Sequence, residues 1–130
     1  MDITINEGSS VPVYEQIVIQ VLIGIRERRI EINVPLPTIR QLALDLELTS
    51  ATVAKAYQIL ERGKVIATGG RRGTYIHEQA LENSARFIQE QVETQMREFI
   101  HLQLKYGISL PEIQTTFTHI INELTKRGAK

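Results

Sequence analysis

The 130-residue sequence predicts a mainly α-helical fold with one small β-hairpin. Apolar residues recur at intervals of three and four in five separate stretches, which is the period of an amphipathic helix. One pair of short β-prone runs, 65–68 and 74–77, flanks a segment with three glycines in five residues. Hydrophobic residues make up 42% of the chain, which is enough for a real core.

The first helix is expected to begin near Ser10, a plausible N-cap, with Pro12 in its first turn. Its apolar residues form one stripe, and a charged run over 26–29 ends it in solvent. A connector over 30–36 follows, in which Asn33 is suited to a left-handed conformation.

Two short helices joined by a tight turn come next. Thr38 and Gln41 have the spacing of a capping box, which marks the start of the second helix. Thr49 is expected to cap the third helix, over 49–62, and Gly63 to end it. A helix pair of this kind presents its second helix to the major groove of DNA.

The hairpin over 65–77 has a basic, glycine-rich tip. Arg71 and Arg72 lie between glycines, which let a backbone approach a ligand closely. Such a tip can reach phosphates or a narrow, A·T-rich minor groove, whose negative potential attracts arginine. Together with the helix pair, the hairpin is expected to complete one DNA-facing domain over residues 1–78.

Residues 79–130 are expected to form a helical hairpin. Apolar residues step by threes and fours from Leu81 to Leu102, and Ser109 with Glu112 forms a second capping box before another stripe. Two amphipathic helices alone bury little surface, so a second copy of the hairpin is the simplest partner, giving a twofold-symmetric dimer. The predicted dimer interface comprises Leu81, Ile88, Val92, Met96, Phe99, Phe117, Ile120 and Leu124.

Charge is unevenly distributed along the chain. Fifteen basic residues balance fifteen acidic ones, yet the segment from Thr38 to Thr74 holds six basic and three acidic residues. Binding to phosphates depends on the local electric field of the protein more than on the net charge of the whole chain. The segment predicted to face DNA is therefore positive.

Other functional classes find little support in the sequence. The chain has no cysteine, so disulfides and thiolate metal sites are excluded. We expect a cytoplasmic protein, because neither a signal peptide nor an apolar stretch long enough to span a bilayer is evident. Glu98 with His101, and His119 with Glu123, have helical metal-site spacing but supply too few ligands, so no metal or cofactor is expected. No nucleophile grouping or phosphate-cradling loop indicates an enzyme.

Four separated pieces of sequence resemble the GntR family of bacterial transcription regulators. They lie at 13–17, 36–43, 52–61 and 73–76, in the family's order and spacing. The short helical C-terminal segment is similar to the YtrA-type branch. The resemblance implies a winged helix-turn-helix, a homodimer and an inverted-repeat operator, and members of this branch often repress transporter operons, commonly their own.

The resemblance and the residue types together predict the DNA-binding residues. Arg40 occupies the position of the family's DNA-contacting arginine. The third helix begins with side chains that carry hydroxyl groups and a methyl group, and Lys55 is suited to binding a phosphate. The predicted set is Arg40, Thr49, Ser50, Ala51, Thr52, Lys55, Arg71, Arg72 and Gly73.

Three positions depart from the family pattern. Many members carry arginine at the position of Ser50, often another basic residue at Ala54, and usually glycine at Asn33. Arginine is the commonest specific reader of guanine. An alternative therefore stays open, a winged-helix protein-interaction module with weak or lost DNA binding. Failure to bind DNA at low salt would favour it.

Overall fold

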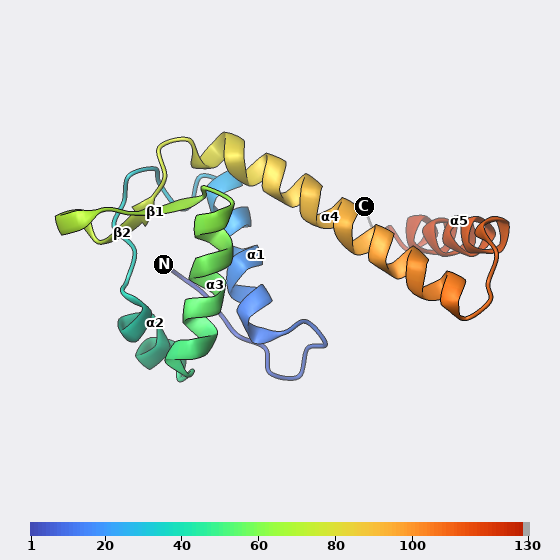
Figure 1. Cartoon of the computed structure of the whole chain (residues 1–130), viewed down its shortest axis with the longest axis horizontal. Coiled ribbons are helices and arrows are strands. Elements are labelled where there is room, and N and C mark those ends of the chain that lie inside the picture. Colours follow the sequence, from blue (N-terminus) through green and yellow to red (C-terminus); the bar gives the residue numbers. More distant parts are fainter. Residues whose placement is uncertain (129–130) are drawn as a thin grey trace. The chain divides into compact units, whose positions relative to one another are not determined.

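The computed structural model describes residues 1–128 and divides into two compact units, Met1–Gln89 and the chain from Glu90 onward (Figure 1). The expected fold class is confirmed, because the described residues form five α-helices and one two-stranded antiparallel hairpin. The elements are α1 (Val13–Arg26), α2 (Ile39–Leu46), α3 (Ser50–Arg62), β1 (Ile66–Thr68), the 3₁₀ turn η1 (Gly70–Arg72), β2 (Thr74–Ile76), α4 (Ala80–Lys105) and α5 (Leu110–Lys126).

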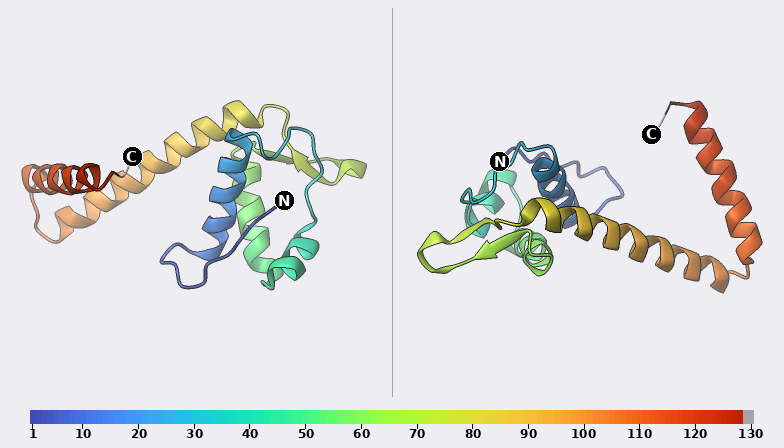
Figure 2. Two further views of the ribbon diagram at one scale, coloured as in Figure 1. Left: turned by 180° about the vertical axis from the view of Figure 1, so that it is seen from behind. Right: turned by 90° about the horizontal axis from the view of Figure 1, so that it is seen from above.

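The core of the first unit lies between α1, α2, α3, the hairpin and the first turns of α4. Helices α1 and α3 lie side by side and pack against each other (Figures 1 and 2). Their facing stripes are the ones that the helical period predicts, and several members have no exposed surface. The fully enclosed apolar side chains include Ile17, Val21, Val53, Leu60, Val65 and Ile76.

The N-terminal arm, residues 3–6, is bound to α1 by glutamine side chains, and no side chain caps this helix. The helix begins at Val13 with Pro12 at the N-cap, which offers no side-chain acceptor, so the prediction that Ser10 caps this helix is wrong. Gln16 instead ties the arm to α1. Its Oε1 accepts from the Asn6 N–H at 2.9 Å, and its Nε2 donates to the carbonyls of Asn6 and Val11, each at 2.9 Å.

One helical turn later, Gln20 repeats this arrangement on Thr4. Its Oε1 accepts from the Thr4 N–H at 2.9 Å and its Nε2 donates to the Thr4 carbonyl at 2.7 Å. Ile3 and Ile5 of the arm pack against the core. Side-chain amides thus satisfy backbone groups that a neighbouring strand would otherwise pair.

The predicted caps of α2 and α3 are confirmed. The Thr38 side chain accepts from the Gln41 N–H at 3.0 Å, and the Gln41 side chain accepts from the Thr38 N–H at 3.0 Å. Helix α2 ends at Glu47, which is left-handed with φ 57°. The Thr49 side chain then caps α3 by accepting from the Thr52 N–H. These local bonds fix the turn between the two helices.

Gly63 follows α3 as predicted, but for a different reason. Its φ is −78°, and the left-handed residue is Lys64, with φ 57°. A Cβ added at Gly63 would overlap the Phe87 ring. Glycine is therefore required here by the close approach of an aromatic side chain.

The hairpin is joined to the connector that precedes α2. Strands β1 and β2 pair Ile66 with Ile76, Ala67 with Tyr75 and Thr68 with Thr74. On the other side of β2, backbone bonds run from Asn33 N to Ile76 O, from Ile76 N to Val34 O and from Leu36 N to Thr74 O, at 3.0, 3.1 and 2.9 Å. Asn33 has the expected left-handed conformation, with φ 66°.

The start of α4 belongs to the first unit. Ala80 and Ser84 have no exposed surface, and the Asn83 side chain donates to the Lys64 carbonyl at 2.9 Å. The expected boundary at 78/79 lies just before α4 begins, whereas the compact unit continues to Gln89.

Two residues predicted for the dimer interface, Leu81 and Ile88, are half-buried against the core of this unit. Both side chains keep part of their surface exposed, so their place in a dimer interface stays a prediction. Helical spacing alone places them on one stripe with the residues that follow, but the early turns of that stripe face the winged helix.

The second unit contains the rest of α4 and α5. Ser109 caps α5, since its Oγ accepts from the Glu112 N–H at 3.3 Å and donates to the Glu112 carboxylate at 2.9 Å. The Phe99 and Phe117 rings meet with centroids 5.8 Å apart, tilted by 58°. Ile113 is buried, yet other apolar side chains of the stripe are 41–56% exposed, namely Val92, Met96, Phe99, Ile120 and Leu124.

No helix within residues 1–128 combines the length and the hydropathy that a membrane span requires.

Candidate nucleic-acid interface

The first turn of α3 is exposed and polar. The Thr49 and Thr52 hydroxyl oxygens lie 3.0 Å apart, and Thr49 also accepts from the Thr52 N–H at 3.4 Å. Both hydroxyls are therefore partly used in capping. Ser50 and Ala51 are exposed, and within residues 1–128 the Ser50 hydroxyl makes no hydrogen bond. Ser50 offers the free donor and acceptor in this turn, while Ala51 offers a methyl group.

Lys55 lies one turn further along α3 and contacts an aromatic ring. Its Nζ is 4.0 Å from the centroid of the Tyr14 ring at the start of α1. A cation above a ring at an exposed site is stabilised by about 0.5–1 kcal/mol. Tyr14 is half-buried, and its ring also favours this position of the ammonium group. This pairing of distant residues has no signal in the local sequence.

Arg40 is exposed in the first turn of α2, which contains no acidic residue. The partial positive charge of a helix N-terminus adds to the field of a cation placed there. Among the described residues, the Arg40 guanidinium has no hydrogen-bond or ionic partner. It is free to bind an anion.

The wing tip, residues 69–73, is a closed turn and not the loose loop that its glycines suggest. Gly69 N–H donates to the Gly73 carbonyl at 3.0 Å around the 3₁₀ turn η1. Gly73 has φ 66° and ψ −136°, a combination that only glycine adopts readily. In Figure 2 the tip projects away from the helices of its unit.

The two wing arginines differ in their surroundings, although both are exposed. Arg71 has no partner within residues 1–128. The guanidinium carbon of Arg72 lies 3.7 Å from the centroid of the Tyr75 ring, and its Nη2 donates to the Asn33 Oδ1 at 3.4 Å.

The charges of this unit remain accessible. All six basic side chains between Thr38 and Thr74 are exposed, and none of them forms an ion pair with another described residue. Six cations against three carboxylates leave an excess of positive charge in the segment that contains the polar start of α3.

Tyr57 supports this surface from beneath. It is buried, and its hydroxyl donates to the Pro37 carbonyl at 2.7 Å. Burial raises the pKa of Tyr57 to about 12, because the phenolate would lose its hydration. The bond joins α3 to the residue that precedes the α2 cap, so it helps to fix the angle between the two helices. Sequence periodicity predicts the burial but not the partner of the hydroxyl.

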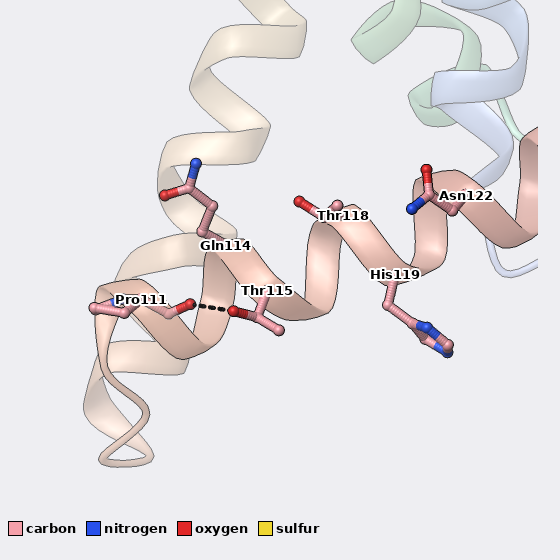
Figure 3. A pocket seen from close by; sticks show the side chains of 6 residues that line it. All are labelled: Pro111, Gln114, Thr115, Thr118, His119 and Asn122. Carbon is pink, nitrogen blue, oxygen red and sulfur yellow. Dashed lines mark hydrogen bonds between the residues drawn. The ribbon is translucent and has the colours of Figure 1, made fainter.

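The described histidines form no metal-binding cluster. Within residues 1–128, no three residues among His, Asp and Glu could hold one metal ion. His119 Nε2 lies 3.5 Å from Glu123 Oε2, as a single pair one turn apart. A shallow hollow beside them is lined by Pro111, Gln114, Thr115, Thr118, His119 and Asn122, all from α5 (Figure 3). These side chains all project from one face of a single helix, so they do not surround a small molecule.

The helix pair and the wing match a known family. The profile described as bacterial regulatory proteins, gntR family, matches residues 13–76. The HTH-type transcriptional repressor YtrA of Bacillus subtilis is 38% identical over 95 residues, which cover 70% of this chain and 73% of YtrA. The chain belongs to the GntR family. As a GntR regulator of the helix-turn-helix type, it is a DNA-binding protein.

Solved structures share the GntR fold over nearly the whole chain. A transcriptional antiterminator from Listeria monocytogenes EGD-e is 30% identical, with a TM-score of 0.64 and coverage of 92% of this chain and 90% of that one. YtrA from Sulfolobus acidocaldarius, a GntR-family transcription factor, is 25% identical, with a TM-score of 0.55 and coverage of 95% and 99%. The predicted winged helix and the YtrA-like branch are thereby confirmed.

Proposed function

We propose that this GntR protein is a homodimeric, cytoplasmic repressor that binds an inverted-repeat operator, in the manner expected for a regulator of a transporter operon. The observation that carries the proposal is the exposed start of α3, flanked by unpaired cations on α2 and the wing. Repression is supported by the 38% identity to a relative named as a repressor.

In this mechanism α3 enters the major groove. Ser50 and Ala51 face the bases, where a hydroxyl can pair with either base type and a methyl group can contact thymine. Arg40 and Lys55 bind phosphates and set the register of the protein on the duplex. The wing tip binds the flank of each half-site.

The second unit supplies the dimer contact. Six residues of the predicted interface lie in this unit: Val92, Met96, Phe99, Phe117, Ile120 and Leu124. Five of these are 41–56% exposed, and a second copy of the unit would cover them. The two winged helices of the dimer would then meet half-sites about one helical turn apart, or slightly more.

The proposal is tested with a duplex enriched by the unaltered chain from a random-sequence pool. A dimer that makes about six phosphate contacts should give a log–log slope of affinity against salt near −5. A flat salt response would contradict phosphate-dominated binding.

The small side chains at Ser50 and Ala54 keep one alternative in view, a winged-helix module that binds protein and has lost DNA affinity. That alternative predicts that a chain shown by sedimentation to be dimeric enriches no duplex, even at low salt.

A further inference from the structure

The inference concerns the wing arginines and rests on the proposed function. Arg72 is held from two directions, by the Tyr75 ring at 3.7 Å and by the Asn33 amide at 3.4 Å. Arg71, its neighbour in the same turn, has no partner among the described residues. The two arginines therefore differ in freedom although they share sequence context and exposure.

Asn33 reaches Arg72 because of its own backbone. Its left-handed φ of 66° and the bond from its N–H to the Ile76 carbonyl hold it beside the end of β2. Glycine would adopt this conformation as easily, but it has no side chain to offer. The amide at position 33 thus adds a contact without changing the turn.

Tyr75 is fixed as firmly. It pairs with Ala67 across the hairpin and forms a bridge with Pro35 of the connector. These pairings anchor the Tyr75 backbone, and the ring reaches the Arg72 guanidinium from that fixed point. At 3.4 Å the hydrogen bond to Asn33 is long, so the ring contact supplies most of the restraint and the amide sets the rotation of the guanidinium plane.

We propose that Asn33 and Tyr75 are positioning residues that present Arg72 as the fixed phosphate-binding side chain of the wing. A guanidinium stacked by one face keeps its in-plane N–H donors free, and only one of them is used by Asn33. The remaining fork matches two oxygens of a phosphate. A side chain folded back onto a ring cannot also extend into a minor groove, so the expected partner is the phosphodiester backbone.

Holding the side chain in place before binding strengthens binding, because less rotamer freedom is lost when the contact forms. Arg71 has no such restraint. We therefore expect Arg72→Ala to lower affinity for the enriched duplex by about 10-fold, and Asn33→Gly by about 3-fold. Arg71→Ala is the matched control and should have the smaller effect of the two arginine variants.

The test is a double-mutant cycle. Asn33→Gly should lower affinity in the unaltered chain and in Arg71→Ala, but should have no further effect in Arg72→Ala. Arg72→Ala should also reduce the salt slope by about 0.9 per protomer, for duplexes with either A·T-rich or G·C-rich flanks. Tyr75→Phe should keep full affinity because it retains the ring. Tyr75→Leu removes the ring but keeps the guanidinium, so it should lower affinity by less than Arg72→Ala and should have no further effect in Arg72→Ala.

Three results would overturn the inference while DNA binding stands. They are an Asn33→Gly effect that persists without Arg72, an Arg71→Ala loss larger than that of Arg72→Ala, and an Arg72→Ala loss confined to A·T-rich flanks. An unaltered chain that enriches and binds no duplex would overturn the proposed function itself, and this inference with it.

Discussion

The hydrogen bonds that hold the N-terminal arm allow the loss of stability on their removal to be predicted. Gln16→Ala removes three bonds, two to Asn6 and one to Val11, at a side chain that is 9% exposed. An intramolecular hydrogen bond contributes about 0.5–1.5 kcal/mol net. Because the arm can partly rehydrate once released, we expect the free energy of unfolding to fall by about 2–3 kcal/mol. For a unit of this size, Tm should drop by on the order of 10 °C.

Gln20→Ala is the matched control. It removes two solvent-exposed bonds to Thr4 at a half-buried side chain, where water replaces them, so we expect a loss of about 1 kcal/mol or less. Urea unfolding should be followed at one protein concentration, because association adds to the apparent stability of a dimer.

Hydrogen exchange gives a residue-specific readout of the same bonds. The Asn6 amide should be protected in the unaltered chain and exchange freely in Gln16→Ala. The reasoning would be refuted by equal stabilities of the two glutamine variants, or by an Asn6 amide that exchanges at the unfolded rate in the unaltered chain.

Three further predictions concern α3, the DNA contact and the dimer. The pKa of Tyr57 is about 12 in the folded protein and 10 when the side chain is exposed, so unfolding between pH 10 and 12 releases a proton. The free energy of unfolding should therefore fall as the pH rises from 10 to 12, by up to about 3 kcal/mol. An ultraviolet titration should show one tyrosine ionising near pH 12. Tyr57→Phe should abolish both this ionisation step and the loss of stability between pH 10 and 12. A Tyr57→Phe variant with the same titration curve as the unaltered chain would contradict the assignment. Arg40→Ala should weaken binding of the enriched duplex about 10-fold with an unchanged thermal transition, since the side chain is exposed; loss of the transition would disprove a surface role. Phe99→Glu should dissociate the dimer in sedimentation by placing a charge in an apolar contact, whereas an unaltered profile would rule out the C-terminal interface.

Features set by near neighbours in the chain could be predicted from the sequence. The caps at Thr38, Thr49 and Ser109 are determined by side chains three residues away, so their spacing is sufficient evidence. The left-handed turn at Asn33 was equally predictable, because few residue types tolerate that conformation.

Contacts between distant segments could not be predicted in this way. Ser10 looks like a cap because of its local context, yet Gln16 binds the arm across a loop. Helical periodicity cannot tell which turns of a long helix face their own domain, so it does not predict that Leu81 packs against the core of the first unit. The same holds for the candidate site. The basic character of Lys55 and Arg72 predicts a role in DNA binding, but nothing in the local sequence predicts that the Tyr14 and Tyr75 rings contact them.

The backbone pairing between the connector and β2 has a mechanical consequence. The segment 33–36 bonds to β2 along one edge and leads directly into the Thr38 cap of α2. The tip of the wing therefore cannot swing without pulling on the start of α2, where Arg40 lies. Main-chain geometry therefore sets the distance between the wing tip and the start of α2. The protein should consequently discriminate among duplexes by the width of their grooves as well as by their bases.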